Sequence, residues 1–416
     1  MTRVEGSTLR AWRRSRGWDV PRMARELRQA AADEPMPVHD ALIRMIRGWE
    51  RGDHRLSERY QLLYRKAVGI PEPPGKPQDP PPARAVLVSP SALSWAVPVY
   101  DAVLNPVDAT RRAGAGAAVA RTSLAALRQA FGAVLRASLA SDYGRLAASL
   151  PALIGTTELA NLNAGGTEQL QQLLSDVYAI SAWTLIKADL AAAAWNAAQR
   201  ALELAEQAGD VLRCAAATRC LSEVHMRAAS FGEASRTAFL AATYLDTSPR
   251  ARRPAALCLR GASLLSASAA AARRGDSREA HASLKAADAC AGTLGRDRDD
   301  LGTVFGPTNV AIHQVAVAVE LGDARTAVRL APAVDLTRMP AHLTERRARF
   351  LIDVARGHAQ LREDDAAIGA LTEAERISAD EVRNHRLTRQ VLRDLLTRER
   401  PSSGLRDLAS RCHAVA

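Results

Sequence analysis

A proline-rich segment near the start of the chain limits what the whole sequence can fold into. Residues 71–90 read PEPPGKPQDPPPARAVLVSP. Each proline fixes its backbone φ angle and lacks an N–H donor, so this segment can be neither a helix nor a central β-strand. We interpret it as a semi-extended linker between residues 1–70 and residues 91–416. The chain of 416 residues is long enough for two or three domains, or for one long helical array.

The composition favours helices on both sides of the linker. Hydrophobic residues make up 47% of the chain, which is enough for a full core, and alanine is abundant throughout. No window shows the clean alternation of polar and apolar residues that is typical of a β-strand. The predicted fold class is therefore all-α.

Positive charge is concentrated before the linker. Residues 1–70 contain 15 Lys and Arg against 9 Asp and Glu, which gives them +6 of the chain's net charge of +11. A net positive charge favours a polyanionic partner such as nucleic acid.

Residues 1–70 contain residues that typically begin and end helices, and they divide the segment into four short helices. A first helix, Leu9–Arg16, ends at Gly17, and Asp19 is placed to cap a second helix. A third helix runs from His39 to Arg51, and a fourth follows Ser57. The apolar positions of the third helix are Leu42, Ile43, Met45, Ile46 and Trp49.

Two stretches of this segment resemble a known DNA-binding family. Residues 9–17 read LRAWRRSRG, and residues 46–52 read IRGWERG. They are similar to the Leu-Arg-x-x-Arg-x-x-x-Gly opening helix and the Ile-x-x-Trp-Glu-x-Gly close of the recognition helix in the lambda-repressor-like, or XRE, helix-turn-helix family. The resemblance implies a DNA-binding domain over residues 1–70 whose third helix enters the major groove. The connection Arg28–His39 is longer than the tight turn of the family.

The resemblance also implies roles for individual side chains. Ile43, Arg44 and Gly48 lie at base-reading positions. Arg44 would donate two hydrogen bonds to a guanine edge and Ile43 would pack on a thymine methyl, whereas Gly48 offers no side chain. Phosphate contacts are expected from four further arginines, which are Arg47, Arg51, Arg55 and Arg22.

Residues 91–416 contain a weak repeat. Four short breaks are centred on Gly232, Gly275, Gly322 and Glu363, at intervals of 43, 47 and 41 positions. Small residues at helical spacing follow the breaks and would let a second helix pack closely on the first. At this period the segment would hold roughly seven helical hairpins. It resembles the tetratricopeptide-like (TPR-like) α-solenoids that are fused to XRE domains, especially in actinobacterial regulators.

In such arrays the first helix of each hairpin lines a concave groove, and the resemblance implies that this groove senses a peptide or small ligand. Asn309 and His313 share one helical face, and Arg349, Asp353 and Arg356 share another. An asparagine amide can clamp a peptide unit, and arginine fits a carboxylate. Two alternatives stay open: Arg349 and Asp353 form an intrahelical ion pair, or His313 is an ordinary core histidine.

Other chemistry is not indicated. The chain has no phosphate-binding loop, no His-Glu-x-x-His and no zinc-ligand spacing, so we expect no enzyme activity and no cofactor or metal. The five cysteines are widely spaced, which is typical of reduced thiols in a cytoplasmic protein. Neither a signal peptide nor a run of 18 apolar residues is present, so we expect no membrane association.

The sequence thus predicts a sequence-specific transcriptional regulator that binds double-stranded DNA. A homodimer is expected because one small domain reads too few bases to be selective, whereas a dimer reads a palindrome. The repeat segment would provide dimerisation and ligand sensing. The alternative function is a helical-repeat scaffold for protein interactions, in which the basic segment is only an accessory.

Overall fold

The structure is a computed structural model. It describes residues 6–31, 37, 39–53, 60, 63–64, 67–68, 94–106, 108–109, 111, 123–245, 251–398 and 403–414. Within these residues the fold is all-α, as predicted, and the only β-type pairing is an isolated antiparallel bridge between Arg298 and Phe305. The predicted linker, residues 71–90, lies outside the described residues, as does Ser57.

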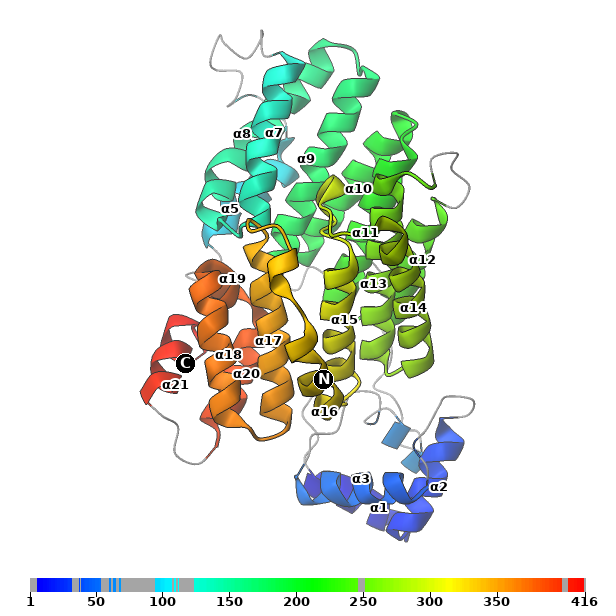
Figure 1. The fold of residues 1–416 in the computed structure, drawn as a ribbon. Helices are drawn as coiled ribbons and strands as arrows, with labels where there is room; N and C mark the ends of the chain where they lie inside the picture. The colour runs from blue at the N-terminus through cyan, green and yellow to red at the C-terminus, as the bar shows by residue number, and fades with distance from the viewer. Residues whose placement is uncertain are drawn as a thin grey trace. The chain divides into compact units, whose positions relative to one another are not determined.

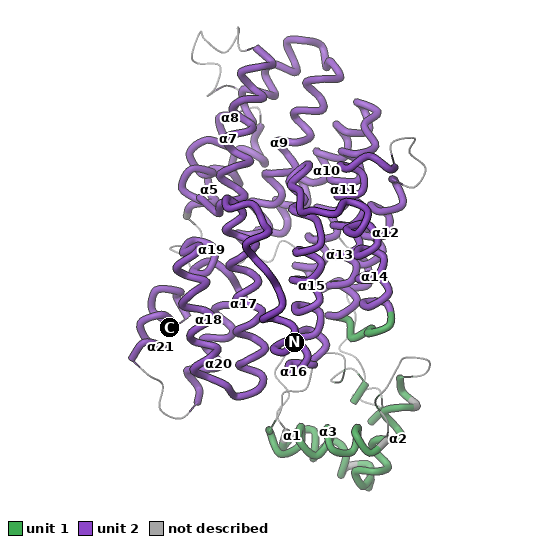
Figure 2. The backbone as a smooth tube through the Cα atoms, viewed as in Figure 1, with its two compact units in different colours: residues 1–84, 274–278 green, residues 85–273, 279–416 purple. Residues whose placement is uncertain are grey.

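The chain divides into two compact units (Figure 2). Unit 1 comprises residues 1–84 with 274–278, and unit 2 comprises residues 85–273 with 279–416. The two units are described separately below.

Unit 1 contains the helices α1 (Gly6–Ser15), α2 (Val20–Ala30) and α3 (His39–Arg51). The bounds of α3 confirm the prediction, whereas α1 begins at Gly6 and not at Leu9. Gly17 follows α1 with a φ of 66°, a left-handed conformation that glycine adopts without strain. The Asp19 carboxylate accepts a hydrogen bond from the Arg22 amide at 2.7 Å, so it caps α2 as expected.

The core of unit 1 lies along one face of α3. Leu42, Ile46 and Trp49 are at most 5% exposed and pack with Leu9 of α1 and Met23 of α2. Their spacing of four and three residues puts all three on one side of the helix. The opposite side of α3 is therefore left to its polar residues.

A buried ion pair locks α3 to α1. The Glu50 carboxylate accepts hydrogen bonds from Arg13 Nε at 2.6 Å and Arg13 Nη2 at 2.8 Å, and another from the Tyr64 hydroxyl at 3.0 Å. Glu50 is 6% exposed and Arg13 is 8% exposed. Burying either charge without the other would be very unfavourable, and the bidentate pair compensates both.

Unit 2 consists of helices from Ser94 to the C-terminal region (Figure 1). They are α5 (Val97–Leu104), α7 (Leu124–Leu139), α8 (Tyr143–Asn163), α9 (Glu168–Lys187), α10 (Ala191–Gln207), α11 (Val211–Arg227), α12 (Phe231–Thr243), α13 (Pro254–Arg274), α14 (Ser277–Leu294), α15 (Pro307–Glu320), α16 (Ala324–Leu330), α17 (Thr344–Gln360), α18 (Asp364–Ile377), α19 (Ala379–Asn384), α20 (Arg386–Leu396) and α21 (Ser403–Arg411). Several consecutive helices pack in pairs, among them α9 with α10, α11 with α12, and α17 with α18.

The predicted breaks correspond to turns between helices, with one correction. Gly275, Gly322 and Arg362 occupy such turns with left-handed φ values of 81°, 82° and 65°. The first predicted break is wrong, because Gly232 lies inside α12 and the turn residue is Ala229, with a φ of 58°. Alanine can adopt this conformation at the end of a helix at a cost of about 1–2 kcal/mol. The position of the nearby glycine therefore does not coincide with the turn.

Helix α13 has the length and composition of a membrane-spanning helix, which the sequence analysis overlooked. In its most apolar window, 72% of the residues are buried inside the structure, as in the core helix of a soluble protein. Its Cys258 is fully buried, and all five cysteines of the chain are free and buried.

The ion pair between Glu50 and Arg13 leads to a stability prediction. Glu50→Gln removes the charge that compensates buried Arg13, so we expect the opening free energy of α3 to fall by about 3–5 kcal/mol. Native-state hydrogen exchange of the α3 amides measures this quantity. The matched control is Asp53→Asn, which breaks the exposed ion pair with Arg51. This substitution should change the opening free energy of α3 by less than about 1 kcal/mol. Equal effects of the two substitutions would contradict the role given to Glu50.

Candidate functional sites

The first candidate site is the outward face of α3. Arg44 and Arg47 are exposed, and neither forms a hydrogen bond or an ion pair with any described residue. They lie three positions apart on the helix, so their side chains project from the same side. This side of α3 offers two uncompensated guanidinium groups to a partner.

Two other predicted phosphate ligands already have acidic neighbours. Arg51 Nη2 lies 2.8 Å from the carboxylate of Asp53, and Arg22 Nε lies 3.7 Å from that of Glu26. The Arg22 guanidinium is also 5.6 Å from the ring centroid of Trp18. These contacts are solvent-exposed, so exchanging them for a phosphate contact would cost little.

The remaining predicted DNA ligands are less accessible or not described. Ile43 is half-buried and packs against the core of unit 1. Gly48 is buried, so a base contact through this residue is not available in the structure. Arg55 lies outside the described residues.

The second candidate site is a cavity within unit 2, with a volume of ≈ 170 Å³. It is lined from successive odd-numbered helices, α9, α11, α13, α15 and α17, and from the start of α20. By general estimates, such a volume holds roughly ten water molecules or one compact ligand. Its charged and histidine lining residues are Arg219, Glu223, Arg227, Arg273, His313, Glu320, Arg346, Arg349, Asp353, His385 and Arg386.

Four of the five predicted groove residues line this cavity: Asn309, His313, Arg349 and Asp353. Arg356 does not line it, but its Nη1 is 2.8 Å from the Asp353 carboxylate and 3.1 Å from that of Glu320, which does. The alternative ion pair between Arg349 and Asp353 is absent from the described contacts. Arg356 takes Asp353 as its partner instead, one turn along the same helix.

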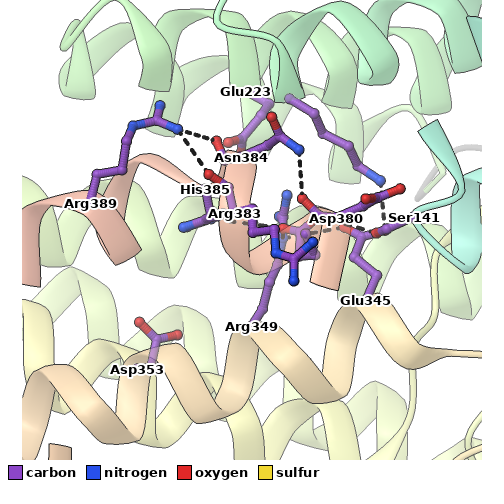
Figure 3. Close-up of polar contacts among 12 residues, drawn as sticks. Ser141, Glu223, Glu345, Arg349, Asp353, Asp380, Arg383, Asn384, His385 and Arg389 are labelled. Atoms are coloured by element: carbon purple, nitrogen blue, oxygen red, sulfur yellow. Dashed lines mark hydrogen bonds and ion pairs between the residues drawn. The ribbon is translucent and has the colours of Figure 1, made fainter. Parts of the chain in front are cut away.

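Arg349 belongs to a buried network (Figure 3). Its Nε lies 2.7 Å from Glu381 Oε1 and 3.3 Å from Glu345 Oε1. The Tyr143 and Ser141 hydroxyls donate to the other Glu381 oxygen at 2.5 and 3.1 Å. Burial alone would raise the pKa of Glu381, but the charges of Arg349 and Lys187 and the hydrogen bond from Tyr143 act together against it, so this pKa is lowered and the carboxylate stays ionised.

Asn309 and His313, which were predicted to share one face of α15, both line the cavity and are held in place by hydrogen bonds. The Asn309 side-chain amide donates to the carbonyl of Val304 at 2.6 Å, and His313 Nδ1 is 2.9 Å from the carbonyl of Asn309. A carbonyl only accepts, so Nδ1 carries the proton and Nε2 is left as an acceptor. Burial, reinforced by the charge of Arg346, lowers the pKa of His313 to about 3, so its imidazole is neutral at pH 7.

The sequence analysis did not identify two cavity arginines, and neither forms an ion pair with a carboxylate among the described residues. Arg219 is 9% exposed, its guanidinium lies 4.6 Å from the ring centroid of Trp183, and its Nε has no hydrogen-bond partner. Arg346 forms neither a hydrogen bond nor an ion pair within the described part of the chain. Burial lowers the pKa of both groups. The spacing Arg219-x₃-Glu223-x₃-Arg227 on one face of α11 was the signal that could have found Arg219.

The cavity wall carries an excess of positive charge. Six arginines and three carboxylates line it, and its histidines have lowered pKa values, so the excess is three positive charges. Including the paired neighbours Lys187, Glu345, Arg356 and Glu381 adds two charges of each sign and leaves the excess unchanged. The site therefore favours an anion.

Comparisons with protein-family models, with curated proteins and with solved structures found no match to this chain. Within the described residues, no group of three or more His, Cys, Asp or Glu side chains could hold a metal ion. The two sites must therefore be interpreted from their own geometry.

The neutral state of His313 leads to a pH prediction. In the unfolded chain this imidazole takes up a proton near pH 6.5, whereas in the folded chain it does so only near pH 3. Its contribution to stability is thus complete above pH 6.5 and is lost as the pH falls toward 3, by up to about 1.4 kcal/mol per pH unit. Replacing His313 by Gln should reduce the change in unfolding free energy per pH unit, as measured by urea unfolding between pH 7 and pH 4.

His342→Gln is the matched control for this experiment, because His342 is an exposed histidine. His385 is also buried against the cavity, and burial lowers its pKa in the same direction, so a residual slope is expected in His313→Gln. An unchanged slope in His313→Gln would contradict the buried, neutral state of this residue.

Proposed function

We propose that the chain is a sequence-specific DNA-binding transcriptional regulator in which α3 is the recognition helix. The observation that carries the proposal is the division of α3 into two faces. Leu42, Ile46 and Trp49 anchor one face in the core, while Arg44 and Arg47 project from the other and contact no partner among the described residues. A rigid helix with free guanidinium groups has the form and charge that fit a major groove.

The two arginines would have different roles. Arg44 lies in the first half of α3, where it would donate two hydrogen bonds to the O6 and N7 atoms of a guanine. Arg47 would contact a phosphate, which positions the helix without reading sequence. Under this proposal α2 and α3 form the helix-turn-helix of an XRE-type domain, and a homodimer reads a palindromic operator in the cytoplasm.

Unit 2 would act as the TPR-like, ligand-sensing part of the regulator. The support is the position of the cavity, which is lined by alternate helices of the array. A ligand that binds one conformation of the dimer more tightly would shift the population of DNA-binding arrangements. The proposal gives the chain no catalytic role.

The first test concerns sequence reading. Bound fragments are selected from a random DNA pool with the full-length chain, and the affinities of the selected site and a scrambled site are then compared. Replacing Arg44 by Ala should reduce the difference between the two sites by about 1–3 kcal/mol, because the guanine contact is lost. Unchanged selectivity would exclude Arg44 as a base-reading residue.

The second test concerns the phosphate contact. Arg47→Ala should weaken binding to both sites alike, and it should reduce the slope of log affinity against log salt by about 1. Arg376→Ala, which removes an exposed arginine of α18 in unit 2, is the control and should leave affinity and slope unchanged.

The alternative function, a protein-interaction scaffold, predicts a different result. The full-length chain would then show no DNA complex at physiological salt, and neither arginine substitution would have an effect. Failure of the random-pool selection to enrich any sequence would therefore overturn the proposal.

A further inference from the structure

The cavity of unit 2 contains cationic groups that form no ion pair with any described residue. Arg273 Nε lies 3.3 Å from the carboxylate of Glu320, and Arg349 Nε lies 2.7 Å from that of Glu381. Arg219 and Arg346 have no carboxylate partner among the described residues. Unpaired charges in a buried wall lower stability, so their presence needs a reason other than folding.

The unpaired arginines are positioned for a ligand. The Arg219 guanidinium lies over the Trp183 ring, 4.6 Å from its centroid, in a cation–π contact, while its Nε has no acceptor among the described residues. Arg346 extends from α17, and Arg219 extends from α11, so the two groups approach the cavity from different helices. Two such groups can bind the oxygens of one anion through charge-assisted hydrogen bonds.

The same cavity also offers acceptors. Asn309 is 2% exposed, and its Nδ2 donates to the carbonyl of Val304, whereas its Oδ1 accepts no hydrogen bond from any described residue. The Nε2 atom of neutral His313 is a second acceptor. These atoms fit a hydroxyl or amine donor on the ligand, at a position separate from its anionic group.

We propose that this cavity binds a small dianion that carries a phosphate or carboxylate group and at least one hydroxyl or amine donor. Arg219 and Arg346 bind the anionic group, and Asn309 and His313 accept hydrogen bonds from the donor. A dianion fits better than a monoanion because the wall has an excess of three positive charges. This inference deepens the ligand-sensing part of the proposed function, but its test measures ligand binding directly and is independent of DNA.

The experiment is isothermal titration calorimetry of the full-length chain at low ionic strength with three probes. Glycerol phosphate carries a phosphate dianion and hydroxyls, malate carries two carboxylates and one hydroxyl, and glycerol is the neutral comparison. We expect at least one of the two dianions to bind, and glycerol not to bind. Binding of glycerol phosphate alone identifies a phosphate ester as the ligand class, and binding of malate alone identifies a carboxylate.

Two substitutions connect binding to the cavity. Arg219→Met and Arg346→Met keep an unbranched apolar side chain and remove the guanidinium group with its charge, and each should weaken binding of the dianion at least tenfold. Arg376→Met, in an exposed ion pair with Glu373 on α18, is the matched control and should bind as the unmodified chain does. Absence of binding by both dianions, or binding that both cavity variants retain, would overturn the proposal.

Thermal unfolding without ligand separates a binding role from a structural one. Removing a half-buried charge that has no ion-pair partner among the described residues relieves an unfavourable interaction, so Arg346→Met should unfold at the same temperature as the unmodified chain or higher. The variant should also lose the rise in melting temperature that the dianion gives the unmodified chain. A marked fall in melting temperature without ligand would show that Arg346 is structural and would contradict the assignment.

Discussion

The buried carboxylate of Glu381 connects parts of unit 2 that are far apart in the sequence. Glu381 is 1% exposed and lies 2.7 Å from Arg349 of α17, and it accepts hydrogen bonds from Ser141, in the turn before α8, and from Tyr143, the first residue of α8. Hydrophobic packing alone would specify the relative positions of such distant helices less uniquely. A buried carboxylate with three donors has only one satisfactory position, so it fixes these helices around the cavity.

The arginines of this protein are of two kinds, which differ in whether a carboxylate lies within ion-pair distance. Arg13, Arg349 and Arg356 each contact a carboxylate that is largely buried, and these pairs fix helices. Arg44 and Arg219 have no carboxylate partner among the described residues, one on an exposed helix face and the other on a cavity wall. The high arginine content is thus divided between pairs that position helices and unpaired groups that can bind a partner.

Unit 1 shows why a short sequence pattern can indicate a whole arrangement of helices. Trp49 fills the core between the helices, and the adjacent Glu50 binds Arg13 of α1 with both carboxylate oxygens. These two neighbouring side chains set the position of α3 against α1. Arg44 and Arg47 are then displayed outward as a consequence of the packing, because they lie on the face that the core does not use.

The sequence by itself determined the all-α class, the bounds of α3, the Asp19 cap and the helical faces that contain Asn309, His313, Arg349 and Asp353. These features depend on local patterns, since capping and helical periodicity act over a few residues. Only the tertiary structure decided that Arg349 pairs with Glu381 and not with Asp353, and that Arg219 and Arg346 form no ion pair with any described residue. Ion pairing in a buried site depends on which distant helices meet there, and no spacing along one helix contains that information.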